Sequence, residues 1–337
     1  MALSDILVFA VNSVLPVILL VALGYILKEK GFFSKEFLKV ANKTVFRVLL
    51  PVLLFTNLAE LDSFSQLRWD AVLYVLAAIA ILFGIGLLFA RTVPDRYQKG
   101  VLLQCDFRSN FALVGVPLAQ LMAGEKGVQA VAILSAFTIP IFNVLSVISL
   151  SVYIQSESDG GSRIAGTVRG ILHNPLIIGV LAGIVCVLLK PAAQYLPTGM
   201  TLFLSKLTFV GTVLDYLAKA STPVALLVLG GQFEMSSIKD LKRQIILGVI
   251  GRLLFAPLIG IGGAALLQGL GIFRFDNGTY AALIALFGTP VAVASAIMAE
   301  EMGNDGQLAG QLVVWTTLLS AGVIFGSVVL MRALGFV

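Results

Sequence analysis

Long apolar runs, separated by short polar connectors, follow one another along the whole chain. Each run is near or above the roughly 18–20 residues that an α-helix needs to cross a lipid bilayer. The apolar residues are continuous rather than alternating, which favours helices over the strands of a membrane barrel. The pattern therefore predicts ten membrane-spanning helices, at residues 6–27, 37–60, 69–91, 97–123, 127–155, 171–189, 203–233, 244–270, 278–302 and 307–334.

The composition agrees with this interpretation. Hydrophobic residues make up 58% of the chain and charged residues 12%, and the mean hydropathy is +1.00. These values are typical of an all-α integral membrane protein and exclude an ordinary soluble domain. The first run follows Asp5 without a preceding Lys or Arg and has no small-residue cleavage site. We interpret it as a retained helix, not a signal peptide.

Basic residues are distributed unequally between the two sets of connectors. The connectors after odd-numbered helices hold most of the lysines and arginines that lie between the predicted spans. Such residues are favoured in cytoplasmic loops, so we expect these connectors inside and both termini outside. Loop placement also explains the net charge of +5, and nothing in the sequence supports nucleic-acid binding.

The longest connector, residues 156–170, divides the chain into two predicted halves of five helices, 1–155 and 171–337. Pro16 and Gly24 in the first helix are matched at the same spacing by Pro175 and Gly183 in the sixth. Because five is an odd number, two halves with a common fold would cross the membrane in opposite directions, as an inverted repeat. Chance alignment of Pro and Gly in apolar helices is the alternative.

The fourth predicted helix holds the densest group of polar residues, Asp106, Arg108 and Asn110. A charged side chain at mid-bilayer costs about 2.5–3.5 kcal/mol on insertion scales, so such groups usually face a cavity, a partner or a substrate path. On a regular helix Asp106 and Arg108 would point in nearly opposite directions, and one of them would face lipid. A broken helix removes this difficulty.

Candidate breaks occur in corresponding helices of the two halves. Gly115 and Pro117 interrupt the fourth helix, and Gly288, Thr289 and Pro290 interrupt the ninth; proline removes a hydrogen bond and kinks a helix. Matching interruptions in two halves point to a transporter's binding site. The N-termini of the half-helices would suit a carboxylate. The alternative is that Gly and Pro are simply frequent in membrane helices.

Other charged residues in apolar surroundings have more than one interpretation. Arg47 and Arg252 are candidates for an inner vestibule, although Arg252 could also extend its head group toward the membrane surface. Asp215 and Lys219 are four residues apart, which is the spacing of a stabilising pair within one helix. That interpretation stands beside a functional one.

Signatures of catalysis are missing from the sequence. It contains neither the GxxxxGK[ST] loop of ATP-binding proteins nor the HExxH metal motif, so we expect a protein that is not an enzyme. The single histidine and the two cysteines, Cys105 and Cys186, make a metal site improbable. No cofactor is expected, and proton or sodium coupling is left open.

Several segments, in this order and spacing, resemble the auxin efflux carrier family, particularly its short bacterial members. They are "LPVILLVALGYILKEKGFFS" with "VFRVLLPVLLFTNL", then "HNPLIIGVLAGI", "STPVALLVLGGQF", "RLLFAPLIG", "TPVAVASAIMAEEMGND" and "VVWTTLLS". Together they cover nearly the full length of the chain.

The resemblance implies a ten-helix inverted repeat with two crossed, broken helices, an architecture shared with bile acid symporters and sodium/proton antiporters. Helices 1, 2, 6 and 7 would form a scaffold, through which we expect a homodimer, and helices 3–5 and 8–10 a transport domain. By position, Asn110 and Pro117 would belong to the first crossover and Pro290 to the second. The family moves organic anions, namely auxin in plants and malate, malonate or similar carboxylates in bacteria.

We therefore expect a multi-pass transporter of the bacterial inner membrane that moves a small organic anion by an elevator-type mechanism. Arg108 would neutralise the carboxylate, and hydrogen bonds would come from Asn110, Thr289 and Ser295. Asp106 would orient Arg108 or carry a coupling proton. A sodium-coupled symporter of the bile acid transporter type and a membrane sensor that binds without transporting are the alternatives.

Overall fold

The computed structural model describes residues 3–59, 68–154, 173–190 and 208–336. These residues are almost entirely helical and form no β-strand, and five of their helical segments are long and apolar enough to cross a membrane. The all-α membrane fold expected from the sequence is thus confirmed at this level. The expected linker 156–170 lies outside the described residues, and the ten-helix inverted repeat stays a prediction.

The helices of the first part follow the predicted spans closely. Helix α2, the π-helical turn η1 and α3 run on without a gap, and Gly124, with φ of 59°, separates two helical segments within α6 where the pattern places a boundary. The elements are α1 (Leu3–Glu29), α2 (Lys35–Thr44), η1 (Val45–Leu49), α3 (Leu50–Ala59), α4 (Trp69–Arg91), α5 (Arg96–Phe107) and α6 (Phe111–Val152).

The second part begins with a capped helix. The Asn174 side chain accepts a hydrogen bond from the backbone N–H of Leu176 at 3.0 Å, and Pro175 occupies the first turn, where its missing N–H costs nothing. The elements are α8 (Pro175–Leu189), α10 (Thr208–Gln232), α11 (Ser237–Asp240), α12 (Lys242–Ile250), η3 (Gly251–Phe255), η4 (Leu258–Gly262), α13 (Gly263–Gly269), α14 (Asn277–Phe287), α15 (Ala294–Glu301) and α16 (Gly306–Ala333).

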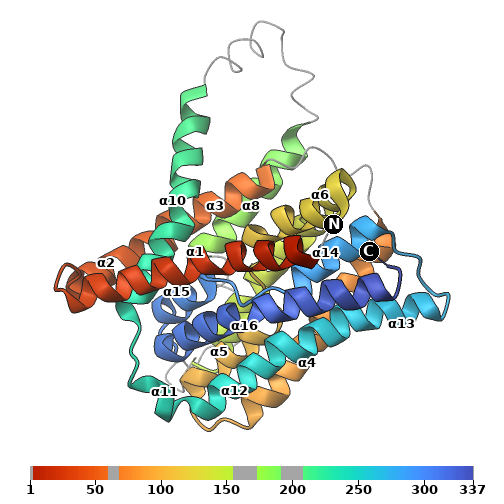
Figure 1. Ribbon diagram of the computed structural model, residues 1–337. Coiled ribbons are helices and arrows are strands. Elements are labelled where there is room, and N and C mark those ends of the chain that lie inside the picture. Colours follow the sequence, from red (N-terminus) through yellow and green to blue (C-terminus); the bar gives the residue numbers. More distant parts are fainter. Residues whose placement is uncertain (1–2, 60–67, 155–172, 191–207, 337) are drawn as a thin grey trace, which may run out of the picture.

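The helices pack in two groups that meet along a long interface (Figure 1). In one group α1 packs on α10 and α3 on α8, and in the other α4 packs on α5, α6 on α14 and α15 on α16. Helices α1 and α10 approach unusually closely, because a Cβ atom on Gly230 would lie 2.0 Å from the carbonyl oxygen of Val21. Small residues permit such contacts between helices in membranes.

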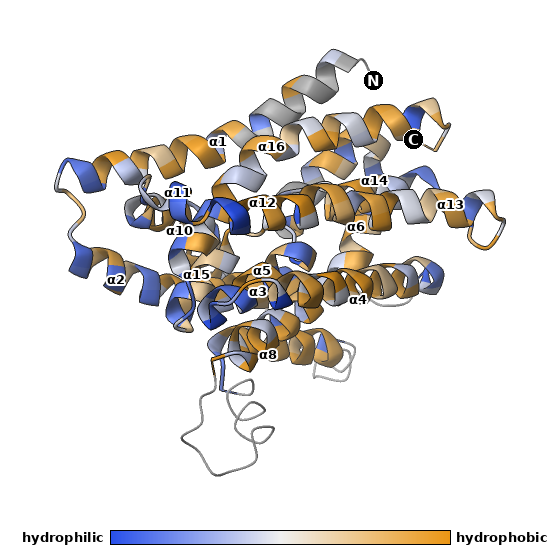
Figure 2. Cartoon of the chain, turned by 90° about the horizontal axis from the view of Figure 1, so that it is seen from below, coloured by the Kyte–Doolittle hydropathy of each residue, from blue (hydrophilic) through white to orange (hydrophobic). Residues whose placement is uncertain are grey.

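Hydrophobic residues predominate along the helices (Figure 2), and many large apolar side chains are exposed. On α1 the exposed residues recur every three or four positions, as Leu15, Leu19, Leu23 and Ile26. A helical face of this kind is stable in lipid but not in water. Hydrophilic residues gather at the end of the molecule where α2 begins and where α11 lies, as expected for the membrane surface.

Helix α14 lies at the centre of its group. Every residue from Gly278 to Phe287 is buried, against α6, η4 and α16. The N-terminal end of α1 and the C-terminal end of α16 lie toward the same side of the molecule (Figure 1). This arrangement is compatible with the expected placement of both termini outside, which stays a prediction.

Candidate functional site

Two helix breaks meet in the interior of the protein. Helix α5 ends at Phe107 and α6 begins at Phe111, while α14 ends at Phe287 and α15 begins at Ala294. The intervening backbones pair as a short antiparallel bridge. The N–H of Asn110 donates to the carbonyl of Pro290 at 2.8 Å, and that of Ala292 donates to the carbonyl of Arg108 at 3.4 Å.

The second break lies where the sequence predicted it, at Gly288, Thr289 and Pro290, and the prediction for the first break was wrong. Residues 108–110 are non-helical, whereas Gly115 and Pro117 lie inside α6. Backbone groups freed from a helix inside a membrane need other partners. At residues 108–110 the opposing break supplies these partners. Pro117 lies at an exposed position, where it removes a single hydrogen bond and no opposing break is present in the described residues.

A partly enclosed cavity of about 140 Å³ adjoins the two breaks. One wall comes from the breaks and α6, and the other from α3, α8 and α10 of the neighbouring group. Most of the lining is apolar, and a small set of polar side chains converges on it. They are Asn57, Arg108, Ser109, Asn110, Asn143 and Thr222.

Arg108 is the cation of this cavity, and its side chain is 4% exposed. One guanidinium nitrogen donates to Oδ1 of Asn143 at 3.0 Å, and another is directed at the sulfur of Met298. Asn143 is itself fixed, because its Nδ2 donates to the Ile139 carbonyl at 2.8 Å. Among the described residues no carboxylate forms an ion pair with Arg108. The site therefore presents a buried positive charge that an anion can neutralise.

Asp106 does not orient Arg108 as the sequence suggested. Its side chain is fully buried, and in the described part of the chain neither carboxylate oxygen has a hydrogen-bond partner. The carboxylate packs against Gly251, where a Cβ atom would lie 1.9 Å from Oδ1, and it does not line the cavity. Positions 106 and 108 lie on either side of the end of α5, so the two side chains diverge.

Three other expected substrate ligands lie at the second break, outside the cavity wall. The Thr289 hydroxyl donates to the Ala285 carbonyl at 2.8 Å, and Pro290 contributes its carbonyl to the bridge. Ser295 is buried and its hydroxyl oxygen has no hydrogen-bond partner in the described residues. None of the three lines the cavity. Of the expected ligands, only Arg108 and Asn110 do.

Sequence reasoning missed Asn143, Asn57 and Thr222. The signal for Asn143 was present, since it is an amide in the middle of an apolar helix, where polar side chains are costly. Nothing in the sequence placed it beside Arg108. Thirty-five positions separate the two residues in the chain. They meet because the chain changes direction at Gly124, between the two helical segments of α6.

The two expected vestibule arginines do not line the cavity. Arg47 is exposed on η1, because Val45, Phe46 and Leu49 occupy the inward positions of that turn. Arg252 is completely buried and donates hydrogen bonds to backbone carbonyls only. The vestibule assignment was therefore wrong for the completely buried Arg252, and for Arg47 it stays a prediction.

Asp215 and Lys219 form the exposed pair within α10 that their spacing suggested. Their side chains approach to 2.6 Å, and each is at least 48% exposed. The pair lies on the surface, away from the cavity beside the two breaks. The structural interpretation is confirmed for this pair.

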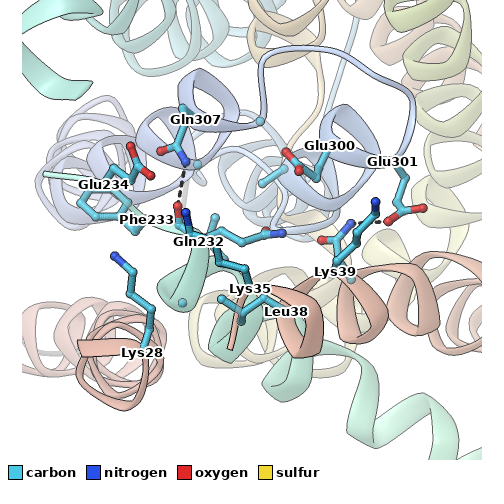
Figure 3. Close-up of a pocket in the computed structure, with 16 residues that line it drawn as sticks. Lys28, Lys35, Leu38, Lys39, Gln232, Phe233, Glu234, Glu300, Glu301 and Gln307 are labelled. Atoms are coloured by element: carbon cyan, nitrogen blue, oxygen red, sulfur yellow. Dashed lines mark hydrogen bonds between the residues drawn. The ribbon is translucent and has the colours of Figure 1, made fainter. Parts of the chain in front are cut away.

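A larger cleft of about 590 Å³ opens at the hydrophilic end of the same interface (Figure 3). Lys28 comes from α1, and Lys35 and Lys39 come from α2, while Glu300 and Glu301 come from the end of α15. Nδ2 of Asn42 donates to Oε1 of Glu301 at 2.8 Å, so a hydrogen bond joins the two helix groups here.

The cleft and the small cavity are neighbours along two shared helices. On α15, Ala294 lines the cavity and Ala296 the cleft, and on α10 the corresponding residues are Ala225 and Leu229. Four residues of a helix span about 6 Å. The hydrophilic end of the molecule is thus about one helical turn from the cavity.

A helical membrane protein with apolar outer faces, and with a cavity that a few polar side chains line where two broken helices meet, has the construction of a membrane transporter. The sequence profile of the family described as membrane transport protein matches residues 9–157 and 164–325. The chain therefore belongs to this family, and its resemblance to the auxin efflux carriers is confirmed.

Two relatives are similar over nearly their whole length. An "Uncharacterized transporter" of Methanothermobacter thermautotrophicus is 28% identical over 316 residues, which is 92% of this chain and 94% of the relative. A "Putative malonate transporter" of Rhizobium meliloti is 25% identical over 332 residues, or 95% of each chain. Both names indicate transport rather than catalysis.

Proposed function

We propose that this protein is a secondary transporter of a small organic anion. The observation that carries the proposal is Arg108, a buried guanidinium that faces the cavity beside the two breaks without a carboxylate partner among the described residues. A buried charge without a counter-charge is costly. An anionic substrate would supply the counter-charge, and the guanidinium can hold a carboxylate by two parallel hydrogen bonds.

The starts of two helices add to the positive potential of the cavity. Phe111, the first residue of α6, and Ala294, the first residue of α15, both line it. The first N–H groups of a helix lack helical partners, and the helix end carries roughly half a positive charge. A carboxylate bound near Arg108 would thus also meet the dipoles of α6 and α15.

The size of the cavity favours a short substrate. Sites for drug-sized ligands measure about 300–1,000 Å³, whereas this cavity measures about 140 Å³. A malonate-like or malate-like dicarboxylate would fit better than an anion that carries an indole ring. The name of the Rhizobium meliloti relative agrees with this choice.

The path of the substrate would follow the interface between the two helix groups. We assign α1, α2, η1, α3, α8 and α10 to a scaffold and the remaining helices, with both breaks, to a transport domain. The cleft at the hydrophilic end would be the cytoplasmic entrance, since it ends about one helical turn from the cavity. An elevator-type displacement of the transport domain along the scaffold would then expose the cavity to the other side.

The proposal also includes a location, an orientation and an oligomeric state. We propose the bacterial inner membrane as the location, with both termini outside, and a homodimer through the scaffold helices. Exposed apolar residues on α8 and α10, such as Ile178, Val185, Val210 and Val213, supply a suitable face for that contact.

Tracer flux into proteoliposomes of purified protein tests the function. Malate, malonate and indole-3-acetate should be compared, with the pH gradient, sodium gradient and membrane potential varied separately. We expect saturable uptake of a short dicarboxylate, and its response to each gradient would show what drives transport. Arg108→Ala should abolish this uptake, while Arg243→Ala, at an exposed arginine of α12, should not.

Two results would contradict the proposal. Wild-type affinity for the substrate in the Arg108→Ala protein would remove Arg108 from the binding site. Saturable binding of the anion to the protein, without flux across tight vesicles, would indicate a sensor instead of a transporter.

A further inference from the structure

Arg252 is the largest completely buried side chain of the described residues, and it belongs neither to the cavity nor to the cleft. It lies in the π-helical turn η3, and such turns occur frequently at functional sites. A guanidinium keeps its charge in proteins, so a buried arginine needs partners that compensate a full positive charge.

All of its hydrogen-bond partners are backbone carbonyls beside the two helix breaks. Nε donates to Thr289 at 2.9 Å, and Nη2 donates to Leu286 and Phe287 at 2.8 and 3.3 Å. Nη1 donates to Asp106 and Phe107, each at 3.4 Å. One guanidinium therefore binds the last residues of α5 and of α14 together.

These carbonyls form a negative site. The last four carbonyls of a helix have no helical partner, and each helix end carries roughly half a negative charge. Two helix C-termini that point at one place carry roughly one negative charge together. A single guanidinium offsets this charge, and the buried Asp106 carboxylate beside Gly251 also attracts it electrostatically.

Close packing of η3 against α5 brings the Arg252 guanidinium within hydrogen-bond distance of these carbonyls. A Cβ atom at position 251 would collide with the carboxylate of Asp106, so a larger residue could not occupy the position of Gly251. The neighbouring residue, Arg252, can therefore extend directly beneath the ends of α5 and α14.

Transporters with broken helices use carbonyls of this kind, at half-helix C-termini, to hold sodium ions. Here the N–H groups of Arg252 already bind them. We propose that Arg252 is a built-in cation that takes the place of a sodium ion at the meeting point of the two breaks, so that anion transport needs no sodium. This inference rests on the proposed transport function and excludes the sodium-coupled alternative.

The test uses the full-length protein as wild type, Arg252→Ala, Arg252→Lys and the control Arg243→Ala. Flux of the transported anion is measured with sodium or choline as the only cation on both sides. The midpoint of thermal unfolding of the purified protein is measured in choline, sodium and millimolar methylguanidinium. Arg243 is exposed at the start of α12 and takes no part in the site.

Wild type and Arg243→Ala should give equal flux in sodium and choline, and an unfolding midpoint that neither sodium nor methylguanidinium raises. Arg252→Ala should lose about tenfold or more in flux, since five buried carbonyls lose their donors. Methylguanidinium should raise the midpoint of this variant alone and restore part of its flux. Arg252→Lys should keep part of the flux, because an ammonium has three donors instead of five.

Specific outcomes would overturn the inference. A wild-type flux that falls about tenfold when choline replaces sodium would show that a sodium ion is still required. An Arg252→Ala protein with unchanged flux and an unchanged unfolding midpoint would show that the five carbonyls need no built-in cation. If Arg252→Ala fails to fold, two measurements still test the inference. They are the comparison of wild-type flux in sodium and in choline, and the flux of Arg252→Lys. If wild type transports no anion, the proposed function fails, and the unfolding midpoints continue to test the built-in cation.

Discussion

At the scale of single residues, two arginines in the same membrane interior have different environments. Arg252 is surrounded by carbonyls and faces no cavity, whereas Arg108 has one amide and a thioether as partners and faces the cavity beside the breaks. Both residues are arginines and both are buried in the protein, so their partners distinguish them. An arginine whose N–H donors all have protein acceptors has a structural role. An arginine with N–H donors left over can bind a ligand.

Replacing Arg108 should remove the main attraction for the substrate. Hydrogen bonds to charged groups contribute about 1.5–3 kcal/mol, so Arg108→Ala should weaken anion affinity by roughly tenfold to 150-fold. Arg108→Lys should recover part of the affinity, because it keeps the charge but loses the bidentate geometry. Concentration-dependent thermal stabilisation by the anion measures both, and equal stabilisation of Arg108→Ala and wild type would contradict the assignment.

Asn143 offers a sharper test of whether the charge of Arg108 binds the substrate. Asn143→Asp changes one atom of the group that already contacts Arg108, and it places a carboxylate 3.0 Å from the guanidinium. The new ion pair should compete with the substrate and reduce its affinity about tenfold or more. The attraction between the two charges should offset much of the loss of the hydrogen bond from Nδ2 to the Ile139 carbonyl, so the unfolding temperature should change little. Tracer flux and thermal unfolding check the two halves of this prediction. Undiminished flux in Asn143→Asp would show that substrate does not bind at Arg108.

At the scale of elements, helix ends supply the groups on which the proposed function depends. The starts of α6 and α15 face the cavity, and the ends of α5 and α14 face Arg252. The proposed anion site and the partners of Arg252 thus come from the same pair of breaks, which the antiparallel bridge joins. Each break supplies one helix start to the cavity and one helix end to Arg252, so the cavity and Arg252 each depend on both breaks.

The start of α14 is fixed by a cap that depends on pH. Asp276 accepts hydrogen bonds from the backbone N–H and the hydroxyl of Thr279, at 2.8 and 2.7 Å, and lies 3.6 Å from Arg68. Partial burial alone would raise the pKa of the Asp276 carboxyl, but the Thr279 hydrogen bonds and the charge of Arg68 together hold it below its usual value of 3.8. A lowered pKa stabilises the fold above the unfolded-state value, and the effect disappears as the pH falls through the folded-state value.

Two variants separate the charge from the cap at this position. Asp276→Asn keeps an acceptor, so its deficit in unfolding temperature relative to wild type should be present near neutral pH and vanish on acidification below pH 3.8. Asp276→Ala should lose about 1 kcal/mol more at neutral pH, because the cap is gone as well. Thermal unfolding as a function of pH measures both. A deficit of Asp276→Asn that grows on acidification would refute the sign of this effect.

At the scale of the whole molecule, the interface between the two helix groups holds a cleft at its hydrophilic end and the cavity beside the breaks about one helical turn away. The hydrogen bond between Asn42 of α2 and Glu301 of α15 crosses this interface. If the second group moves as a body along the first, as we propose, this contact must break in each cycle. A covalent connection at this point should therefore stop transport without affecting binding.

Cross-linking tests that movement. In a background where Cys105 and Cys186 are replaced by alanine, Asn42→Cys with Glu301→Cys can be joined by a short, reducible bis-thiol reagent. We expect flux to be lost after cross-linking and restored by reduction, while each single-cysteine variant keeps its flux after the same treatment. Full flux through a protein shown to be cross-linked would exclude relative movement at this contact.

The sequence by itself determined the membrane class, the helical content and most helix ends, because the length of an apolar run and a local cap such as Asn174 act within a few neighbouring residues. It also located the second break, where Gly288, Thr289 and Pro290 act locally. The tertiary structure alone decided that the first break lies at residues 108–110, that Asn143 rather than Asp106 positions Arg108, and that Arg252 is buried. These outcomes depend on partners that are distant in the chain. Inside a membrane, a polar group lies where another part of the fold can satisfy its hydrogen bonds and charge, and local sequence does not contain that information.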